Sequence, residues 1–179
     1  MWRRFVNRRR LTTSASVLAE LIHAYARAGV TAWMQDGTLL GAVRHGKPIP
    51  WDYDMDLGVW HDEWTPSADA YVKRAGFKNT GNHNNPDRDY HQKWSKRNVR
   101  ICVFHYYEDG DRVYHGIRRG KWRYYYDHRF DVQPVPLDGI LLPAPHPPEW
   151  FLESKYGPDW RVPNQKWASG PDPFNAVPQ

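Results

Sequence analysis

The sequence predicts one α+β domain, and three observations support this prediction. The chain has 179 residues, enough for a single domain with a buried core. Hydrophobic residues make up 40% of it and aromatic residues 15%, which is too apolar for a disordered chain. Helical and strand-like patterns alternate without a repeat or an internal linker. We therefore expect a domain over residues 12–167, after a basic arm over 1–11 and before an irregular tail over 168–179.

The first part of the domain is predicted to alternate between helices and strands. Apolar residues between Val17 and Tyr25 recur on one helical face, and Gly29 is a typical residue at a helix end. From Asp54 to Trp60, apolar residues alternate with aspartates, which is the period of a strand. The predicted elements are a helix over 12–28, a strand over 30–34, a helix over 39–44 and a strand over 54–60.

The second part is predicted around a long strand. Residues from Val99 to Tyr107 form the strongest β-prone run of the chain, and the residues after it have hairpin composition. Pro148 and Gly157 bracket a short helix. The remaining predicted elements are a helix over 63–75, an exposed loop over 79–89, a returning strand over 112–114 and a helix over 149–156.

Charge and composition narrow the classes of ligand and location. The 25 Lys and Arg residues exceed the 20 Asp and Glu residues, and the net charge of +5 suits an anionic ligand such as a nucleotide, a sugar phosphate or a nucleic acid. Cys102 is the only cysteine, which excludes an internal disulfide. The sequence has no membrane-length apolar run and no secretory signal, so we expect a cytoplasmic protein without a transmembrane segment.

Asp54 and Asp56 are the strongest candidates for chemistry. Two carboxylates two residues apart on a strand point the same way, so they can share one hard cation such as Mg²⁺ or Mn²⁺. An ion bound in this way keeps room for substrate phosphates among its ligands. We therefore predict a metal site at this pair.

A glycine turn upstream is a candidate phosphate site. Gly37 and Thr38 precede a predicted helix, whose first amides and dipole suit an anion. Arg44, His45 and Lys47 add positive charge between this helix and the aspartate strand. Together these features predict a phosphate beside a metal ion.

Four segments resemble the LicD, fukutin and fukutin-related protein family. Asp36–Gly46 contains the sequence Asp-Gly-Thr, and Ile49–Val59 contains Trp-Asp-Tyr-Asp-Met-Asp. The similarity continues in Phe104–Asp109 and in Phe151–Trp160, where Leu-Glu-Ser-Lys-Tyr-Gly precedes Pro-Asp-Trp. Together these segments extend the resemblance over roughly residues 15–167.

This resemblance implies both a fold and an activity. The fold would be nucleotidyltransferase-like, with a mixed β-sheet and flanking helices. The activity would be metal-dependent transfer of a phospho-alcohol group, phosphocholine or ribitol phosphate, from a CDP-activated donor to a hydroxyl of a glycan or glycolipid. Asp54 and Asp56 match the metal-binding pair of the family, and Gly37 and Thr38 match its phosphate-binding turn. Asp52 matches a further aspartate, with a supporting catalytic role.

One departure from the family pattern concerns Cys102, which stands where relatives usually carry a third aspartate. A neutral thiol is a poor Mg²⁺ ligand and a poor base near neutral pH. Either another carboxylate such as Glu108 or Asp127 takes this role, or two aspartates suffice, or the chain binds its donor without turnover. The general base stays open.

Other functions are weighed against this one. The same metal pair could support nucleotidyl transfer to a small molecule or an RNA end, and a silent nucleotide- or glycan-binding module is a further alternative. A zinc site at Cys102 and His105, with His83 and His91, lacks the usual second pair of ligands. The aromatic and basic run Lys121–Tyr126 favours core packing first and a ligand contact second, so we expect no stable nucleic-acid partner.

Overall fold

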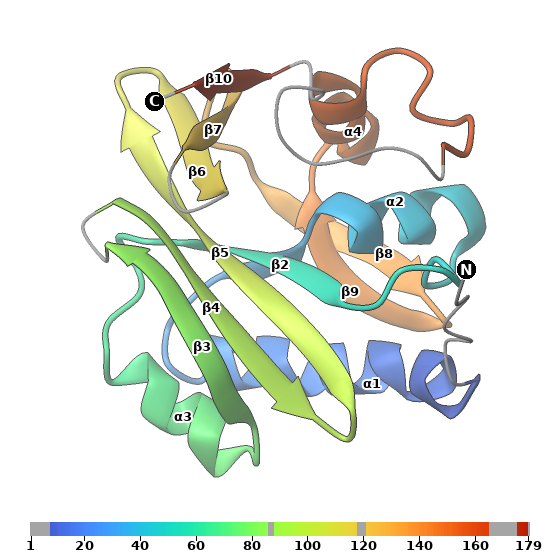
Figure 1. Ribbon diagram of the computed structural model, residues 1–179, viewed down its shortest axis with the longest axis vertical. Coiled ribbons are helices and arrows are strands. Elements are labelled where there is room, and N and C mark those ends of the chain that lie inside the picture. Colours follow the sequence, from blue (N-terminus) through green and yellow to red (C-terminus); the bar gives the residue numbers. More distant parts are fainter. Residues whose placement is uncertain (1–7, 86–87, 118–120, 165–174, 179) are drawn as a thin grey trace.

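The computed structural model describes residues 8–85, 88–117, 121–164 and 175–178, which form a mixed α+β fold (Figure 1). The larger sheet has eight strands, and a separate hairpin forms a sheet of two. Four helices flank these sheets within the described ranges. The predicted class, α+β with a mixed sheet and flanking helices, is therefore confirmed.

The bounds of the elements are as follows. The helices are α1 (Arg8–Ala26), α2 (Asp36–His45), α3 (Ala68–Arg74) and α4 (Pro148–Tyr156). The large sheet contains β1 (Ala32–Met34), β2 (Met55–Trp60), β3 (Lys78–Asn85), β4 (Arg88–Lys96), β5 (Val99–Asp109), β6 (Arg112–Ile117), β7 (Trp122–Tyr126) and β10 (Ala176–Pro178). The hairpin consists of β8 (Val132–Leu137) and β9 (Ile140–Pro145).

Strand β5 lies at the centre of the large sheet. It pairs in parallel with β2 and antiparallel with β4 and β6. Its alternating sequence gives it two different faces, because Ile101 and Val103 are buried whereas Cys102 and Phe104 are only half-buried. In the strand register, Asp56 of β2 and Lys93 of β4 are both paired with Cys102. The half-buried face of the sheet therefore carries a row of polar residues.

Helices cover both faces of this sheet. Figure 1 shows α1 and α3 together on one side of the molecule, and α2 beside α4 on the other. Leu18, Leu21 and Tyr25 of α1 are fully buried, as the helical spacing of the apolar residues predicts. On the opposite side, α2 contacts β2, α4 and β8. The polar row on the sheet faces the side of α2 and α4.

Aromatic rings fill the core where β1, β2 and β5 meet. The ring centroid of Trp33 lies 4.6 Å from that of Trp60, 5.1 Å from that of Tyr106 and 5.3 Å from that of Phe130. Gly58 is the register partner of Trp33, and a Cβ atom at Gly58 would lie 2.5 Å from the indole. Core packing therefore accounts for many of the aromatic residues, and it requires glycine at position 58.

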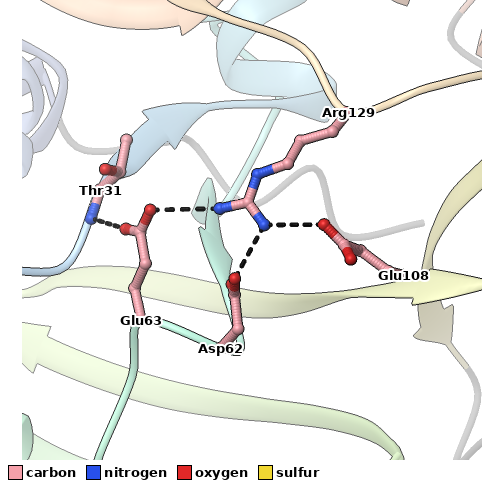
Figure 2. A network of polar contacts seen from close by, with 5 residues as sticks. All are labelled: Thr31, Asp62, Glu63, Glu108 and Arg129. Atoms are coloured by element: carbon pink, nitrogen blue, oxygen red, sulfur yellow. Dashed lines mark hydrogen bonds and ion pairs between the residues drawn. The ribbon is translucent and has the colours of Figure 1, made fainter.

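A network of polar contacts ties the strand ends together beyond this cluster. Figure 2 shows the guanidinium of Arg129 among the carboxylates of Asp62, Glu63 and Glu108, with N···O distances of 2.9, 3.2 and 3.0 Å. Glu63 also accepts a hydrogen bond of 2.6 Å from the backbone amide of Thr31. The same guanidinium lies 4.2 Å from the ring centroid of Trp60. The network joins the segment after β7 to the ends of β2 and β5.

The predicted loop over residues 79–89 is wrong. Residues 78–85 form β3, and β4 begins at Arg88 and pairs with β5. The prediction failed because β3 is a polar edge strand: Asn79 and Asn82 bond to each other, and register shifts interrupt its pairing. Such a strand lacks the apolar alternation by which strands are recognised in sequence.

Several predicted boundaries also differ. α2 begins at Asp36, so Gly37 and Thr38 lie in its first turn, and the positive φ of 50° falls on Asp36. α3 covers only residues 68–74 of the predicted helix over 63–75. α1 begins at Arg8, inside the segment predicted as an arm, whereas residues 1–7 lie outside the described ranges.

Two strand pairings were not predicted. β8 and β9 contain prolines, which cannot donate a ladder hydrogen bond and so argue against a strand in sequence. They are tolerated because each strand of a two-stranded hairpin has an unpaired edge. In the segment predicted as an irregular tail, Ala176–Pro178 pairs antiparallel with β7, and residues 165–174 lie outside the described ranges.

Across the residues that the structure describes, no helix has the length and apolar character that crossing a membrane requires.

Candidate active site

A cleft of about 1010 Å³ lies between α2, α4 and the polar row of the sheet. Its lining combines Asp56 and Cys102 on the sheet with Gly37 on α2 and Lys155 on α4. The cleft therefore joins residues from both halves of the sequence, and its volume is that of a site for a small ligand.

Asp54 and Asp56 lie at the beginning of β2, as their spacing predicts. Asp54 immediately precedes the strand, and Asp56 is its second residue. The backbone amide of Asp56 donates a hydrogen bond of 2.8 Å to Oγ1 of Thr38, whose side chain is buried in the first turn of α2. Thr38 thus connects α2 to the aspartate strand and fixes the position of Asp56.

Gly37 allows the carboxylate of Asp52 to pack against the beginning of α2. A Cβ atom at Gly37 would lie 2.3 Å from Oδ2 of Asp52, so no other residue fits there without displacing that carboxylate. Oδ1 of Asp52 accepts a hydrogen bond of 2.9 Å from the backbone amide of Tyr53. Asp52, rather than open space, therefore lies where the sequence predicts a phosphate.

The carboxylates in the cleft disfavour one another's ionisation. Burial and the neighbouring Asp54 raise the pKa of Asp52 from 3.8 to about 6. Burial raises the pKa of Asp56 well above its ordinary value, and the negative charges of Asp36, Asp54 and Asp52 raise it further. Lys155 opposes this shift in the pKa of Asp56. The site therefore concentrates negative charge that a cation would stabilise.

Cys102 joins the aspartate pair. Its Sγ atom lies 3.6 Å from Oδ2 of Asp54, to which it can donate a hydrogen bond. Ligand atoms of Asp54, Asp56 and Cys102 all lie within 4.8 Å of one another, and all three side chains are half-buried. Burial, followed by the charges of Asp56 and Asp54, raises the pKa of the Cys102 thiol above its ordinary value. These three residues can hold one metal ion.

Lys155 is a site residue that sequence reasoning missed. Its side chain is 1% exposed and forms an ion pair with Asp36, which connects α4 to the beginning of α2. Its Nζ atom lies 4.4 Å from the ring centroid of Tyr124 on β7. The residue belongs to the closing Leu-Glu-Ser-Lys-Tyr-Gly segment, which was the signal that could have indicated it.

The predicted cations occupy different positions. Arg44 lines the cleft, and its guanidinium donates a hydrogen bond of 3.0 Å to the carbonyl oxygen of Val162. His45 is exposed and is not part of the cleft lining. Lys93 on β4 lines the cleft next to Cys102, a position that required the β4–β5 pairing and could not be found from sequence.

Neither carboxylate suggested as a replacement for the third aspartate is part of the site. Glu108 is bound to Arg129 in the network of Figure 2, and Asp127 is exposed and lies outside the cleft lining. The histidines considered for zinc are not among the ligand atoms gathered around Cys102, although His91 lines the same cleft. His105 lies on the buried face of β5, and His83 and His91 stack on each other with centroids 4.6 Å apart.

Two large aromatic side chains stand exposed at the cleft. Trp51 is 49% exposed and Tyr53 60% exposed, and both line the cleft. The Arg100 guanidinium lies 5.3 Å from the ring centroid of Tyr53. Exposed rings beside a polar cleft suit stacking on a flat or cyclic ligand.

Fold and site together define an α+β domain with an acidic pair at the start of a sheet strand, facing a cleft that also contains cationic side chains. The family model described as "LicD/FKTN/FKRP, nucleotidyltransferase domain" matches residues 29–147. The chain therefore belongs to the LicD/FKTN/FKRP family, and the resemblance seen in the sequence is confirmed.

Three relatives illustrate this membership. The ribitol 5-phosphate transferase FKRP of Mus musculus is 31% identical over 73% of this chain and 28% of its own length. The ribitol-5-phosphate transferase FKTN of Mus musculus is 26% identical over 84% of this chain and 33% of its own length. The uncharacterized protein RP689 of Rickettsia prowazekii is 30% identical over 72% of this chain and 47% of its own length. The chain thus spans about a third or less of the two named transferases.

Proposed function

We propose that this domain transfers a phospho-alcohol group, such as ribitol phosphate or phosphocholine, from a CDP-activated donor to a hydroxyl of a glycan or glycolipid. Family membership and the two named transferases support this proposal. The observation that carries it is the pair Asp54 and Asp56, which faces a ligand-sized cleft containing Lys93 and Lys155. We include in the proposal that the α+β fold is of the nucleotidyltransferase-like type.

The proposal includes a divalent ion, Mg²⁺ or Mn²⁺, held by Asp54 and Asp56. These residues fit such an ion because their carboxylates are crowded by like charges and offer oxygen ligands. When bound, the ion would neutralise negative charge on the donor diphosphate. Thr38 contributes by holding the backbone of Asp56 in place.

Lysine side chains are the proposed binding groups for the phosphates of the donor. Lys93 and Lys155 line the cleft, and their positive charges can attract the phosphates of the donor. A phosphate at the beginning of α2 would displace the carboxylate of Asp52 from Gly37. We therefore assign the phosphate contact first to Lys93, whereas Lys155, which is buried in its ion pair with Asp36, contributes positive charge to the cleft.

In the proposed transfer, the acceptor hydroxyl oxygen forms a bond to the phosphorus that carries the alcohol. The bond from this phosphorus to the bridging oxygen of the diphosphate breaks, and CMP leaves with that oxygen. The hydroxyl proton goes to Asp52, a cleft carboxylate outside the trio of Asp54, Asp56 and Cys102. Trp51 and Tyr53 offer rings on which the donor base or the acceptor sugar can stack.

The test is a calorimetric titration of the protein with CDP, CDP-ribitol and CDP-choline, with and without Mg²⁺ or Mn²⁺. We expect metal-dependent binding that is lost in Asp54→Asn/Asp56→Asn, and CMP release when a glycan acceptor is supplied. Asp127→Asn is a matched control, because it removes an exposed carboxylate outside the cleft.

If the protein binds no cytidine diphosphate compound with any divalent metal, the proposed donor is wrong. Binding of nucleoside triphosphates under the same conditions would instead favour nucleotidyl transfer.

A further inference from the structure

The chemistry of the metal site differs from a site made of carboxylates alone. Cys102 is the register partner of Asp56 across the parallel pair of β2 and β5, and it faces the cleft. Its sulfur is 3.6 Å from Oδ2 of Asp54. Among the described residues, Asp54, Asp56 and Cys102 are the group of carboxylate, histidine and cysteine side chains whose ligand atoms come together.

The separation of these atoms is close to what one ion requires. The ligand atoms lie within 4.8 Å of one another. Oxygen and sulfur ligands bind zinc at about 2.0–2.3 Å in a tetrahedral arrangement, so any two of them lie about 3.4–3.6 Å apart. A closure of up to about 1.4 Å would bring the trio to bonding distance, which a rotation of half-buried side chains can supply.

A sulfur ligand changes which ion the site prefers. Mg²⁺ takes oxygen ligands in a nearly octahedral arrangement, whereas a thiolate favours softer ions such as Zn²⁺, and also Co²⁺ and Cd²⁺. Lys93 on β4 is the register partner of Cys102 on β5 and places a positive charge beside the sulfur. The thiol therefore has both the neighbours and the position of a ligand.

We propose that Cys102 is the third protein ligand of this site and that the site binds thiophilic divalent ions, Zn²⁺ foremost, more tightly than Mg²⁺. The proposal deepens the function proposed above, since it concerns the same metal site. It explains the cysteine at the position of the usual third aspartate as a change in metal preference rather than as loss of the site. Binding releases the thiol proton to solvent as the metal–sulfur bond forms.

The experiment uses the absorbance of a metal–thiolate bond. Co²⁺ and Cd²⁺ give ligand-to-metal charge-transfer bands in the ultraviolet when bound by a thiolate. Because Cys102 is the only cysteine, such a band in the purified full chain reports this residue alone. We expect the band on titration with Co²⁺ or Cd²⁺, its removal by equimolar Zn²⁺, and little effect of excess Mg²⁺.

Three variants test the ligand set. Cys102→Ser should abolish the band, Asp54→Asn/Asp56→Asn should abolish or strongly weaken it, and Asp127→Asn should leave it unchanged. Cys102→Asp should lower the affinity for Zn²⁺ and raise that for Mg²⁺, each by at least about tenfold, since loss of even an outer-shell partner costs this much. Circular dichroism of each variant verifies its fold.

Absence of a charge-transfer band in the folded wild type, or unchanged relative affinities for Zn²⁺ and Mg²⁺ in Cys102→Asp, would overturn the proposal. These results are separable from failure of the proposed function. A protein that binds CDP-ribitol with Mg²⁺ but shows no band keeps its function and refutes the role of Cys102. A band without any binding of cytidine nucleotides supports the ligand set and refutes the donor.

Discussion

At the scale of single residues, the site depends on side chains that hold the carboxylates close together. Asp52 and Asp56 are kept near other negative charges by Gly37, which has no Cβ atom, and by Thr38, which binds the Asp56 amide. Like charges in a half-buried cleft oppose folding unless a cation is present. The proposed function therefore requires carboxylates that lie close together, whereas the stability of the fold without a cation would be greater if they lay apart.

Replacement of Asp52 by asparagine tests this opposition. In the metal-free folded protein the pKa of Asp52 is about 6, against 3.8 as its ordinary value. The folded state thus binds a proton more tightly than the unfolded chain, so the contribution of Asp52 to stability is full below about pH 4 and is lost as the pH rises through about 6. At pH 7.5 we expect Asp52→Asn to raise the free energy of unfolding by about 1–3 kcal/mol.

Urea unfolding of both proteins at pH 7.5 and pH 4 measures this effect. The stabilisation should be present at pH 7.5 and nearly absent at pH 4. Equal stability of the two proteins at pH 7.5 would contradict a charge-strained Asp52.

Replacement of Thr38 by valine tests its structural role. The change keeps the shape of the side chain but leaves the amide of Asp56 without its acceptor in a partly buried place. We expect a loss of about 1–3 kcal/mol in the free energy of unfolding, the usual cost of an unpaired buried donor. Thr38→Ser retains the hydroxyl and should recover most of this loss; if serine is as destabilising as valine, the hydrogen bond is not the cause.

The candidate site could be predicted only in part at this scale. Asp54 and Asp56 are two residues apart, so strand periodicity alone places their carboxylates together. Lys93 and Lys155 are far from them in sequence, and no local pattern connects a lysine on β4 or α4 to a pair on β2. The phosphate-binding role of Gly37 and Thr38 stays a prediction. In the structure, the Asp52 carboxylate occupies the space beside Gly37, and the Thr38 hydroxyl accepts a hydrogen bond from the backbone amide of Asp56.

At the scale of elements, α2 and α4 are joined through the ion pair of Asp36 and Lys155. The lysine side chain is 1% exposed and that of the aspartate 14%, so both charges are largely withdrawn from water. Removing one partner of a buried pair leaves the other uncompensated, which is more costly than removing both.

The pair predicts a specific pattern in double variants. Lys155→Met should lower the free energy of unfolding by about 3 kcal/mol. Adding Asp36→Asn should restore more than half of this loss, because no unpaired charge then remains. Chemical unfolding of the two single variants and the double variant gives the coupling; additive losses would mean that the two side chains do not depend on each other.

The elements show where sequence patterns succeed and where they fail. β5 was predicted because Val, Ile, Phe and Tyr are concentrated in it, and α4 because Pro148 and Gly157 mark its ends. β3 was missed because it is held by backbone pairing with β4 rather than by burial of apolar side chains. β8 was missed because its prolines argue against a strand, although Leu137 is buried in the core and its backbone pairs with β9. Propensity does not detect pairing that depends on tertiary context.

At the scale of the whole molecule, metal binding should stabilise the entire domain. A ligand that binds only the folded state at a hundred times its dissociation constant adds about 2.7 kcal/mol. For a domain of this size, that corresponds to a rise of about 5–10 °C in Tm. We expect this rise with a saturating divalent ion at pH 7.5, measured by scanning calorimetry.

The size of this rise should depend on pH with a defined sign. The raised pKa values of Asp52 and Asp56 mean that protons compete with the metal as the pH falls. At pH 5.5 the rise in Tm should therefore be smaller than at pH 7.5. A rise that is equal at both pH values, or that persists in Asp54→Asn/Asp56→Asn, would place metal binding elsewhere.

The ion pair between α2 and α4 also bears on the rate at which the domain folds. Asp36 and Lys155 are 119 residues apart in the sequence, so this contact closes one of the longest loops in the fold. A folding chain that has already assembled α2, β2 and β5 would hold its carboxylates together before the lysine arrives. The carboxylates of such a species would repel one another, and dissolved cations would weaken this repulsion. Refolding measured by stopped flow should therefore accelerate with ionic strength in the wild type, and less so in Asp36→Asn.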